Sequence, residues 1–209
     1  MVQFLIENGA DFHAVDDEGN SILHYACYSK DNINLLEYLF ESGFDFTIQN
    51  KQSMTPLLIA IHQKNRTAAK FLIKNKAGLN VCVSNGDSPL HICAKNGEYD
   101  LMKDLILEGS DVNIQNENGE TPLHLAYWFY NAQEQNDICE LLLDNGAEIN
   151  VLDKNGDSPF YCSLYGQISN RLIRRFLDDG ADLTIKYGRG HNETILNLVI
   201  SRISYISKK

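Results

Sequence analysis

The stretch Thr121-Pro122-Leu123-His124-Leu125-Ala126 decides the fold of this chain, because variants of it recur along the sequence. Successive copies start 34, 33, 33, 37 and 36 residues apart, and they begin at Ser21, Thr55, Ser88, Thr121, Ser158 and Thr194. A period of this size, sustained along the chain, indicates an array of stacked repeats in place of a single globular core.

A second marker follows the first in phase, as in Asn145-Gly146-Ala147-Glu148 and Asp179-Gly180-Ala181-Asp182. The two markers correspond to the start and the end of helical segments. Ser or Thr caps a helix through its side-chain oxygen, and Pro fits the first helical position because its missing N–H is not needed there. Glycine just after an apolar stretch such as Leu105-Ile106-Leu107 allows a left-handed helix cap.

These residues resemble the ankyrin repeat family, whose signature of about 33 residues contains T-P-L-H-x-A. The resemblance covers nearly the whole chain. It implies an all-α solenoid in which each repeat has a short inner helix, an antiparallel outer helix and a β-hairpin loop. It also implies that hairpin tips and inner helices line a concave surface that binds other proteins.

The register predicts a single ankyrin-repeat domain over residues 1–209. It has a half repeat at 1–13, full repeats at about 14–47, 48–80, 81–113, 114–150 and 151–184, and a half repeat at 185–209. The first half is expected to be an outer helix and the last an inner helix, and neither has the polar face that a terminal repeat needs. We therefore expect a segment of a longer array or a larger protein.

Three departures from the repeat are expected to alter it locally. Lys76 replaces a capping glycine, with Gly78 two residues later. Repeat 114–150 carries four extra residues within Trp128–Asp137, and two more lie around Tyr187–His191. Insertions in repeat arrays map to loops, often on the binding face.

The composition favours protein partners. The net charge of −10 repels phosphates, which disfavours nucleic acid and anionic membranes and favours a basic or mixed-charge protein segment. We identify no apolar stretch of the ~20 residues that cross a bilayer and no signal peptide. Five widely spaced cysteines without a CxxC motif predict free thiols in a reducing compartment, so we expect a cytoplasmic or nuclear protein, or one delivered to a host cytosol.

Residues of catalytic type have structural interpretations. His24, His91 and His124 occupy one position in different repeats, and stacked helices lie 8–10 Å apart, too far to share a zinc ion. The resemblance implies that they tie neighbouring turns by hydrogen bonds. Cys27, Cys93 and Cys139 are expected to be small packing residues. The loop at Tyr187-Gly188-Arg189-Gly190 is followed by no GK[ST]. We expect no enzyme activity, metal or cofactor.

The register assigns partner binding to two sets of residues. The first set is the hairpin tips with the residue before each cap: Asp17, Glu18, Asn20, Lys51, Gln52, Met54, Ser84, Asn85, Asp87, Glu117, Asn118, Glu120, Lys154, Asn155 and Asp157. The second set is the ends of the inner helices: Tyr28, His62, Lys95, Trp128, Phe129 and Tyr165.

Within this surface we predict a hot spot at Trp128 and Phe129, since large aromatics dominate binding energy. The alternative is that Asn131–Asn136 folds back and covers both rings. Asn80, Asn113 and Asn150 are expected to bond the hairpin backbone, and the resemblance leaves open their hydroxylation.

The sequence thus predicts a protein–protein interaction module that acts as an adaptor, scaffold or effector. Two other functions stay open: a substrate-recognition platform of a larger enzyme or receptor, and a structural spacer within a longer array.

Overall fold

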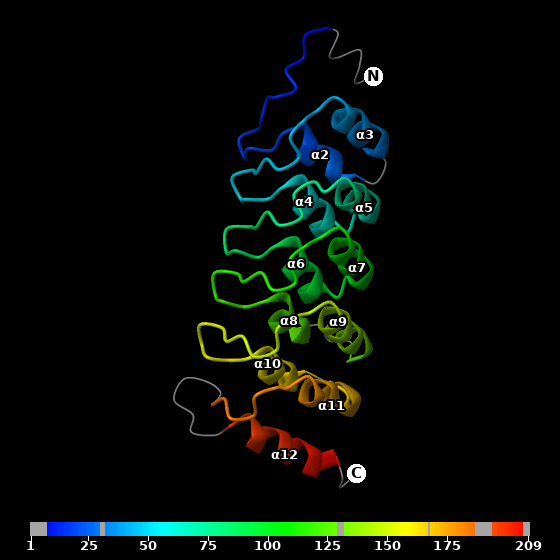
Figure 1. Ribbon diagram of the computed structural model, residues 1–209. Helices are drawn as coiled ribbons and strands as arrows, with labels where there is room; N and C mark the ends of the chain where they lie inside the picture. Colours follow the sequence, from blue (N-terminus) through cyan, green and yellow to red (C-terminus); the bar gives the residue numbers. More distant parts are fainter. Residues whose placement is uncertain (1–7, 30–31, 129–131, 167, 187–193, 207–209) are drawn as a thin grey trace. The chain divides into compact units, whose positions relative to one another are not determined.

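The computed structural model describes residues 8–29, 32–128, 132–166, 168–186 and 194–206, with only the backbone described at Trp128, Ala132 and 201–206 (Figure 1). The chain is all-α, as predicted. Its helices are α2 (Ile22–Tyr28), α3 (Ile33–Glu41), α4 (Pro56–His62), α5 (Arg66–Lys74), α6 (Pro89–Asn96), α7 (Tyr99–Leu107), α8 (Pro122–Leu125), the 3-10 helix η2 (Ala126–Trp128), α9 (Ala132–Asp144), α10 (Pro159–Tyr165), α11 (Asn170–Asp178) and α12 (Ile195–Ile206).

The chain divides into two compact units, and the division cuts α6 after Pro89 and α7 after Met102. Unit 1 comprises Met1–Pro89 and Lys103–Ser110, and unit 2 comprises Leu90–Met102 and Asp111–Lys209. Each unit contains complete helix pairs, so each can be described on its own.

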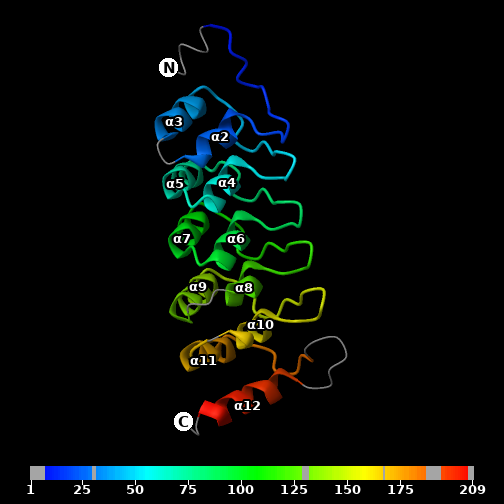
Figure 2. The same cartoon turned by 180° about the vertical axis from the view of Figure 1, so that it is seen from behind.

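In unit 1, inner helices α2 and α4 contact each other, and each contacts its own outer helix, α3 or α5. Figures 1 and 2, from opposite sides, show the inner helices between the loops and the outer helices. The inner helices approach closely because small side chains face their neighbours: Ala26, Cys27 and Ala60 are fully buried.

Unit 2 repeats this arrangement with α8, η2 and α10 as inner elements and α9 and α11 as outer helices. Ala126 of η2 is fully buried and Ser163 of α10 is 1% exposed, so small residues lie between the inner elements of unit 2 as well. The last helix, α12, buries Ile195 and Val199 but exposes Leu196 and Ile200.

The predicted caps are present. Ser21, Thr55 and Ser158 precede α2, α4 and α10, and each accepts a backbone amide of its helix with its side-chain oxygen. Outer helices are capped too: Asn65 accepts the amide of Ala68 at the start of α5. The same Asn65 side chain donates to the carbonyl of Cys27 at 3.0 Å, which joins two successive repeats.

The loops turn back as the predicted hairpins do, but they are tight turns and not strands. Each closes through one bond across its neck, as from the amide of Asp16 to the carbonyl of Asn20 at 3.0 Å. In the described part of the chain, the one β-type pairing is an isolated bridge between Lys186 and Thr194.

The four extra residues of repeat 114–150 do not form a longer loop, contrary to our expectation from other repeat arrays. Helix α9 has 13 residues, whereas α3, α5, α7 and α11 have 9 each. The insertion adds about one turn to the start of the outer helix, because Ala132–Gln135 contains good helix formers. The other predicted insertion, around Tyr187–His191, lies outside the described residues, as does the first predicted outer helix.

Lys76 adopts the left-handed conformation that its position predicted, with φ 56°. Glycines occupy the equivalent positions after the other outer helices at Gly43, Gly109, Gly146 and Gly180, all with positive φ. Among the described helices, none has both the length and the apolar content needed to cross a bilayer.

Candidate protein-binding surface

Among the described residues, the five loops that precede α2, α4, α6, α8 and α10 share one geometry, which residues 116–120 illustrate. The amide of Asn116 donates to the carbonyl of Glu120 at 2.9 Å, and the amide of Gly119 donates back to the carbonyl of Asn116 at 2.9 Å. The turn requires a positive φ at its fourth position, which is 77° at Gly119.

The first side chain of the loop fixes this turn. Oδ1 of Asn116 accepts the amides of Asn118 and Glu120 at 2.9 and 3.0 Å. The same pair of bonds is made by Asp16, Asn50 and Asp153. Val83 replaces this acceptor in the third loop, where Oδ1 of Asn85 accepts the amide of Asp87 at 3.1 Å. Five turns are thus held by bonds within each loop.

Neighbouring loops are also joined through their backbones. In unit 1 the amide of Lys51 donates to the carbonyl of Glu18 at 2.9 Å, and in unit 2 the amide of Lys154 donates to the carbonyl of Asn118 at 2.8 Å. The fit is close: a Cβ added at Gly119 would lie 3.3 Å from the nitrogen of Lys154. Side chains on these loops are therefore presented at a fixed spacing within each unit.

The histidines take the structural role that the resemblance implied. The amide of Ser21 donates to Nδ1 of His24 at 3.1 Å, so Nε2 carries the proton and donates to the carbonyl of Met54 in the next loop at 3.0 Å. Equivalent bonds to the following loop join His91 to Glu120 and His124 to Asp157. These three histidines thus hold a repeat to its neighbour.

The predicted tip residues all point to solvent. We define the loop tips as the second and third positions of each loop. All ten are exposed: Asp17, Glu18, Lys51, Gln52, Ser84, Asn85, Glu117, Asn118, Lys154 and Asn155. The residues before the caps are less accessible. Asp87 is 6% exposed, and the other four are half-buried, namely Asn20, Met54, Glu120 and Asp157.

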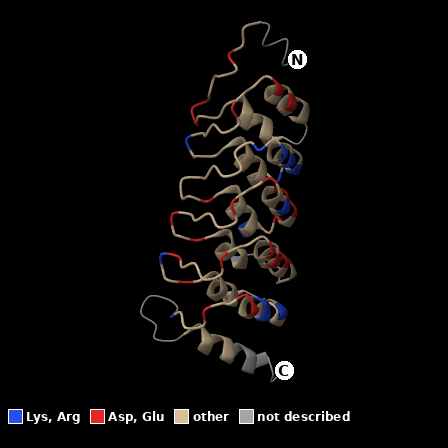
Figure 3. Ribbon diagram, viewed as in Figure 1, with Lys and Arg blue, Asp and Glu red and all other residues tan. Residues whose placement is uncertain are grey.

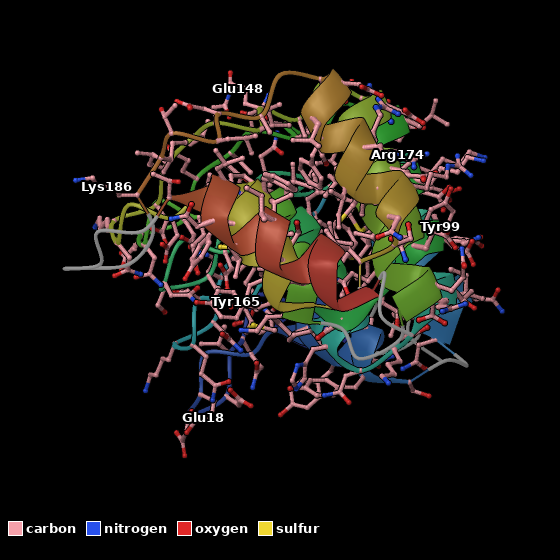
Figure 4. The ribbon with its side chains drawn as sticks, turned by 90° about the horizontal axis from the view of Figure 1, so that it is seen from below. Glu18, Tyr99, Glu148, Tyr165, Arg174 and Lys186 are labelled. Carbon is pink, nitrogen blue, oxygen red and sulfur yellow. The ribbon has the colours of Figure 1, made fainter. Side chains whose placement is uncertain are left out.

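The ends of the inner helices place four predicted residues at the surface. Tyr28 is 45% exposed and Tyr165 is 67% exposed, and His62 and Lys95 are exposed as well. Figure 4 shows Tyr165 of α10 and Arg174 of α11 on different sides of unit 2, so the tyrosine does not share the outer-helix face. Phe129 and the side chain of Trp128, our predicted hot spot, lie outside the described residues.

Comparison with known sequences fits this architecture. A sequence profile described as "Ankyrin repeats (3 copies)" matches residues 1–85, 30–115 and 90–187. The chain belongs to the ankyrin repeat family. Together these matches cover residues 1–187.

Relatives of the chain share only part of their length with it. Rabankyrin-5 of Mus musculus is 28% identical over 112 residues, which is 53% of this chain and 10% of the relative. Palmitoyltransferase AKR1 of Lachancea kluyveri is 28% identical over 114 residues, 53% of this chain and 16% of the relative. L-asparaginase of Dirofilaria immitis is 30% identical over 112 residues, 54% of this chain and 19% of the relative. The similarity thus covers about half of this ankyrin chain and less than a fifth of these relatives.

Tyr25 is a surface residue that the sequence analysis did not single out. It is 52% exposed, and its hydroxyl donates to Oδ2 of Asp16 at 2.6 Å. The signal was present in the register, because the fourth position after the cap is apolar elsewhere, as at Ile59 and Leu125, which are both 3% exposed. A polar aromatic at an apolar position indicates that this site reaches the surface.

Charges on the outer helices pair with each other. Figure 3 shows acidic residues on α9 and basic residues on α11, both in unit 2. Arg171 lies 3.2 Å from Glu140, and Arg175 lies 2.8 Å from Asp144. In unit 1, Lys70 of α5 lies 3.7 Å from Asp104. These pairs offset part of the charge on the outer helices within each unit.

The repeat-closing asparagines bond the turn of the following repeat. Asn113 donates to the carbonyl of Gly146 at 3.0 Å and accepts the amide of Glu148 at 2.8 Å. Asn150 does the same with Gly180 and Asp182. Asn113 and Asn150 therefore bond the turn that follows the outer helix of the next repeat, where we had expected a bond to the hairpin backbone.

Cys27, Cys93 and Cys139 are buried and Cys82 and Cys162 are half-buried, and their thiols are weakly acidic. Burial raises the pKa of the Cys27 and Cys139 thiols to about 12 and also raises the pKa of Cys93 and Cys162. Such thiols stay protonated near pH 7, whereas the thiolate is the nucleophile. Within the described residues, no three His, Cys, Asp or Glu side chains are grouped to hold a metal ion.

Proposed function

We propose that this ankyrin chain is a protein-binding module, and that the loop tips and the exposed ends of the inner helices form its binding surface. The family supports a protein partner. The observation that carries the proposal is the shared loop geometry, which holds ten exposed tip side chains on backbones fixed by internal hydrogen bonds.

Fixed loops favour binding for an energetic reason. Association costs free energy whenever a mobile side chain or loop becomes ordered at the interface, and a preformed surface lowers this cost. The bonds made by Asn116 and Asp153 order the two loops of unit 2 before any partner arrives. Tyr165, 67% exposed, adds an aromatic side chain of the type enriched at binding hot spots.

The partner is proposed to present a basic or mixed-charge segment. Exposed Glu117 and half-buried Glu120 and Asp157 give the loops of unit 2 an acidic balance, with Lys154 as the opposing charge. Opposite charges on a partner would speed encounter by long-range attraction, an effect that salt screens.

Charge reversal tests this proposal on a partner isolated with the intact chain and then purified. We expect Glu117→Lys with Glu120→Lys to slow association by about tenfold at low salt, since steered association varies by one to three decades. As a control, Asp178→Lys reverses an exposed charge on outer helix α11 and should have a much smaller effect. Association rates that respond neither to salt nor to the loop reversal would remove charge from the binding account.

We assign binding and not catalysis to this chain, because His24, His91 and His124 hold neighbouring repeats together. The pKa of every cysteine thiol is raised, so the thiols stay protonated near pH 7. A substrate-recognition platform of a larger enzyme is the second candidate. Relatives named palmitoyltransferase and L-asparaginase support it, since the similarity covers 16% and 19% of their lengths. A structural spacer in a longer array is the third. Sequencing the native transcript separates these two, because a catalytic domain would favour the platform and many further repeats the spacer.

The free cysteines support a reducing location, and we propose the cytoplasm or nucleus. Imaging of the tagged native protein tests this, and recovery from an oxidising compartment would contradict it.

A further inference from the structure

Two half-exposed tyrosines lie together at the surface of unit 1. Tyr25 and Tyr28 of α2 are 52% and 45% exposed. Their ring centroids are 6.0 Å apart, with 40° between the ring planes. One cation could therefore lie within the ~6 Å reach of both ring faces over which cation–π attraction acts.

The first loop fixes the Tyr25 ring beside a carboxylate. Tyr25 donates its hydroxyl proton to Oδ2 of Asp16 at 2.6 Å, and the amides of Glu18 and Asn20 donate to Oδ1 at 2.9 and 2.7 Å. These bonds hold the pKa of Asp16 well below its usual range, and the bond from Tyr25 contributes most. Asp16 therefore stays ionised at neutral pH. A phenol that donates to an ionised carboxylate has a more electron-rich ring, which strengthens its attraction for a cation.

We propose that Tyr25 and Tyr28 form a docking site for an arginine side chain of the protein partner, an inference that rests on the proposed function. The loop beside the rings supplies the complementary charge through exposed Asp17 and Glu18. Lys51 opposes them, because its amide bonds the carbonyl of Glu18, but the three carboxylates of this loop outnumber it.

The geometry favours arginine over lysine. A guanidinium is planar, so it can stack on one tyrosine face and direct its N–H groups at neighbouring carboxylates. Lysine carries a compact and more strongly hydrated charge, which gains less from an exposed aromatic face. An apolar partner residue would gain from the rings but not from Asp17 or Glu18.

Blocked tripeptides of arginine, lysine and neutral citrulline serve as probes in NMR titrations of the full chain. We expect tri-arginine to shift the Tyr25 and Tyr28 ring signals and to bind more tightly than tri-lysine, and we expect citrulline to leave the rings unshifted. Tyr25→Ala and Tyr28→Ala should each weaken tri-arginine binding about two- to fivefold, the loss of a cation–π contact of ~0.5–1 kcal/mol. Tyr25→Phe keeps the ring but loses its bond to Asp16, so it should weaken binding less than Tyr25→Ala.

The control is Tyr99→Ala, which removes a tyrosine that is 36% exposed on outer helix α7. Thermal melts check the fold of each variant, and if Tyr25→Ala melts early, Tyr28→Gln provides the same comparison at the other ring. Equal tri-arginine affinity of the control and the tyrosine variants overturns the docking site. The docking site is also overturned if tri-lysine binds the chain as tightly as tri-arginine does. A chain that binds tri-arginine through these rings but captures no protein keeps the site and overturns the proposed function.

Discussion

At the scale of single residues, Lys76 adopts a left-handed conformation at a position where the other repeats have glycine. Its φ of 56° places a Cβ-bearing residue in the left-handed region, which costs about 1–2 kcal/mol. Lys76→Gly should relieve this strain but restore about 0.5–1 kcal/mol of chain entropy to the unfolded state. We therefore expect the free energy of unfolding to rise by about 0.5–1 kcal/mol, as measured by urea denaturation.

Lys76→Gly also removes a positive charge, but this loss should change the free energy of unfolding little. Lys76 lies 3.8 Å from Glu108 with a side chain that is 67% exposed, and such surface pairs contribute little. Lys74→Gly removes the same charge from the last turn of α5 and should destabilise the protein by about 1 kcal/mol. If Lys76→Gly lowers the free energy of unfolding as Lys74→Gly does, the backbone of Lys76 is not strained.

The inter-repeat histidines predict a pH dependence of stability. Burial lowers the pKa of His24 and His124 in the folded state below the ordinary value of 6.5. The unfolded chain then binds protons more readily, so the free energy of unfolding should fall as the pH falls from about 7 to 5. The carboxylates with lowered pKa, such as Asp45 and Asp182, have an ordinary value of 3.8 and act at lower pH.

Denaturant melts across this range measure the slope. His124→Gln keeps a side-chain donor but does not titrate, so it should flatten part of the dependence. His62→Gln changes an exposed residue at the end of α4 and should keep the slope. Identical slopes in both variants would show that the buried histidines do not set it.

At the scale of elements, the inner helices depend on packing. Helix α8 has four residues before it tightens into η2, and a helix this short is not stable alone. Leu123 is 1% exposed within it, so Leu123→Ala should lower the free energy of unfolding by about 2–5 kcal/mol. Leu152→Ala, at a residue that is 46% exposed, should change it by less than about 0.5 kcal/mol. Equal losses in the two variants would contradict the repeat register.

Local signals in the sequence predicted the elements well. Caps such as Thr55 and the glycine positions act within one turn, so their neighbours in sequence contain the needed information. The fate of the insertion could not be predicted in this way. Spacing showed that four residues were added, and Ala132–Gln135 contains good helix formers. Whether these residues extend α9 or lengthen a loop also depends on packing against η2, which spacing does not show.

The surface was predicted less completely than the core. Repeat register placed the loop tips at the surface, because a turn of fixed geometry must expose its second and third side chains. It did not reveal Tyr25, whose bond to Asp16 joins residues nine positions apart and depends on the folded loop. Contacts that cross elements, like those of Asn113 with the next repeat, are set by stacking and not by local sequence.

At the scale of the whole molecule, we propose that residues 1–209 act as one ankyrin domain in which some repeats are locally more stable than others. A repeat array gains stability from interfaces between nearest neighbours, so a repeat with one neighbour is held less firmly than a repeat with two. Helix α12 fits this pattern, because it leaves Leu196 and Ile200 43% and 54% exposed. Local opening should therefore be easiest toward the ends of this chain.

Amide hydrogen exchange of the full chain tests this distribution. We expect the fastest exchange among hydrogen-bonded amides in residues 185–209 and the slowest in the repeats at 81–113 and 114–150. Adding a consensus outer helix after residue 209 is the matched control, since it should slow exchange in α12 while leaving α4 unchanged. Each repeat would then depend on its neighbour as a linear array requires. Uniform protection along the chain, with no response to the added helix, would instead indicate a closed domain that unfolds all at once.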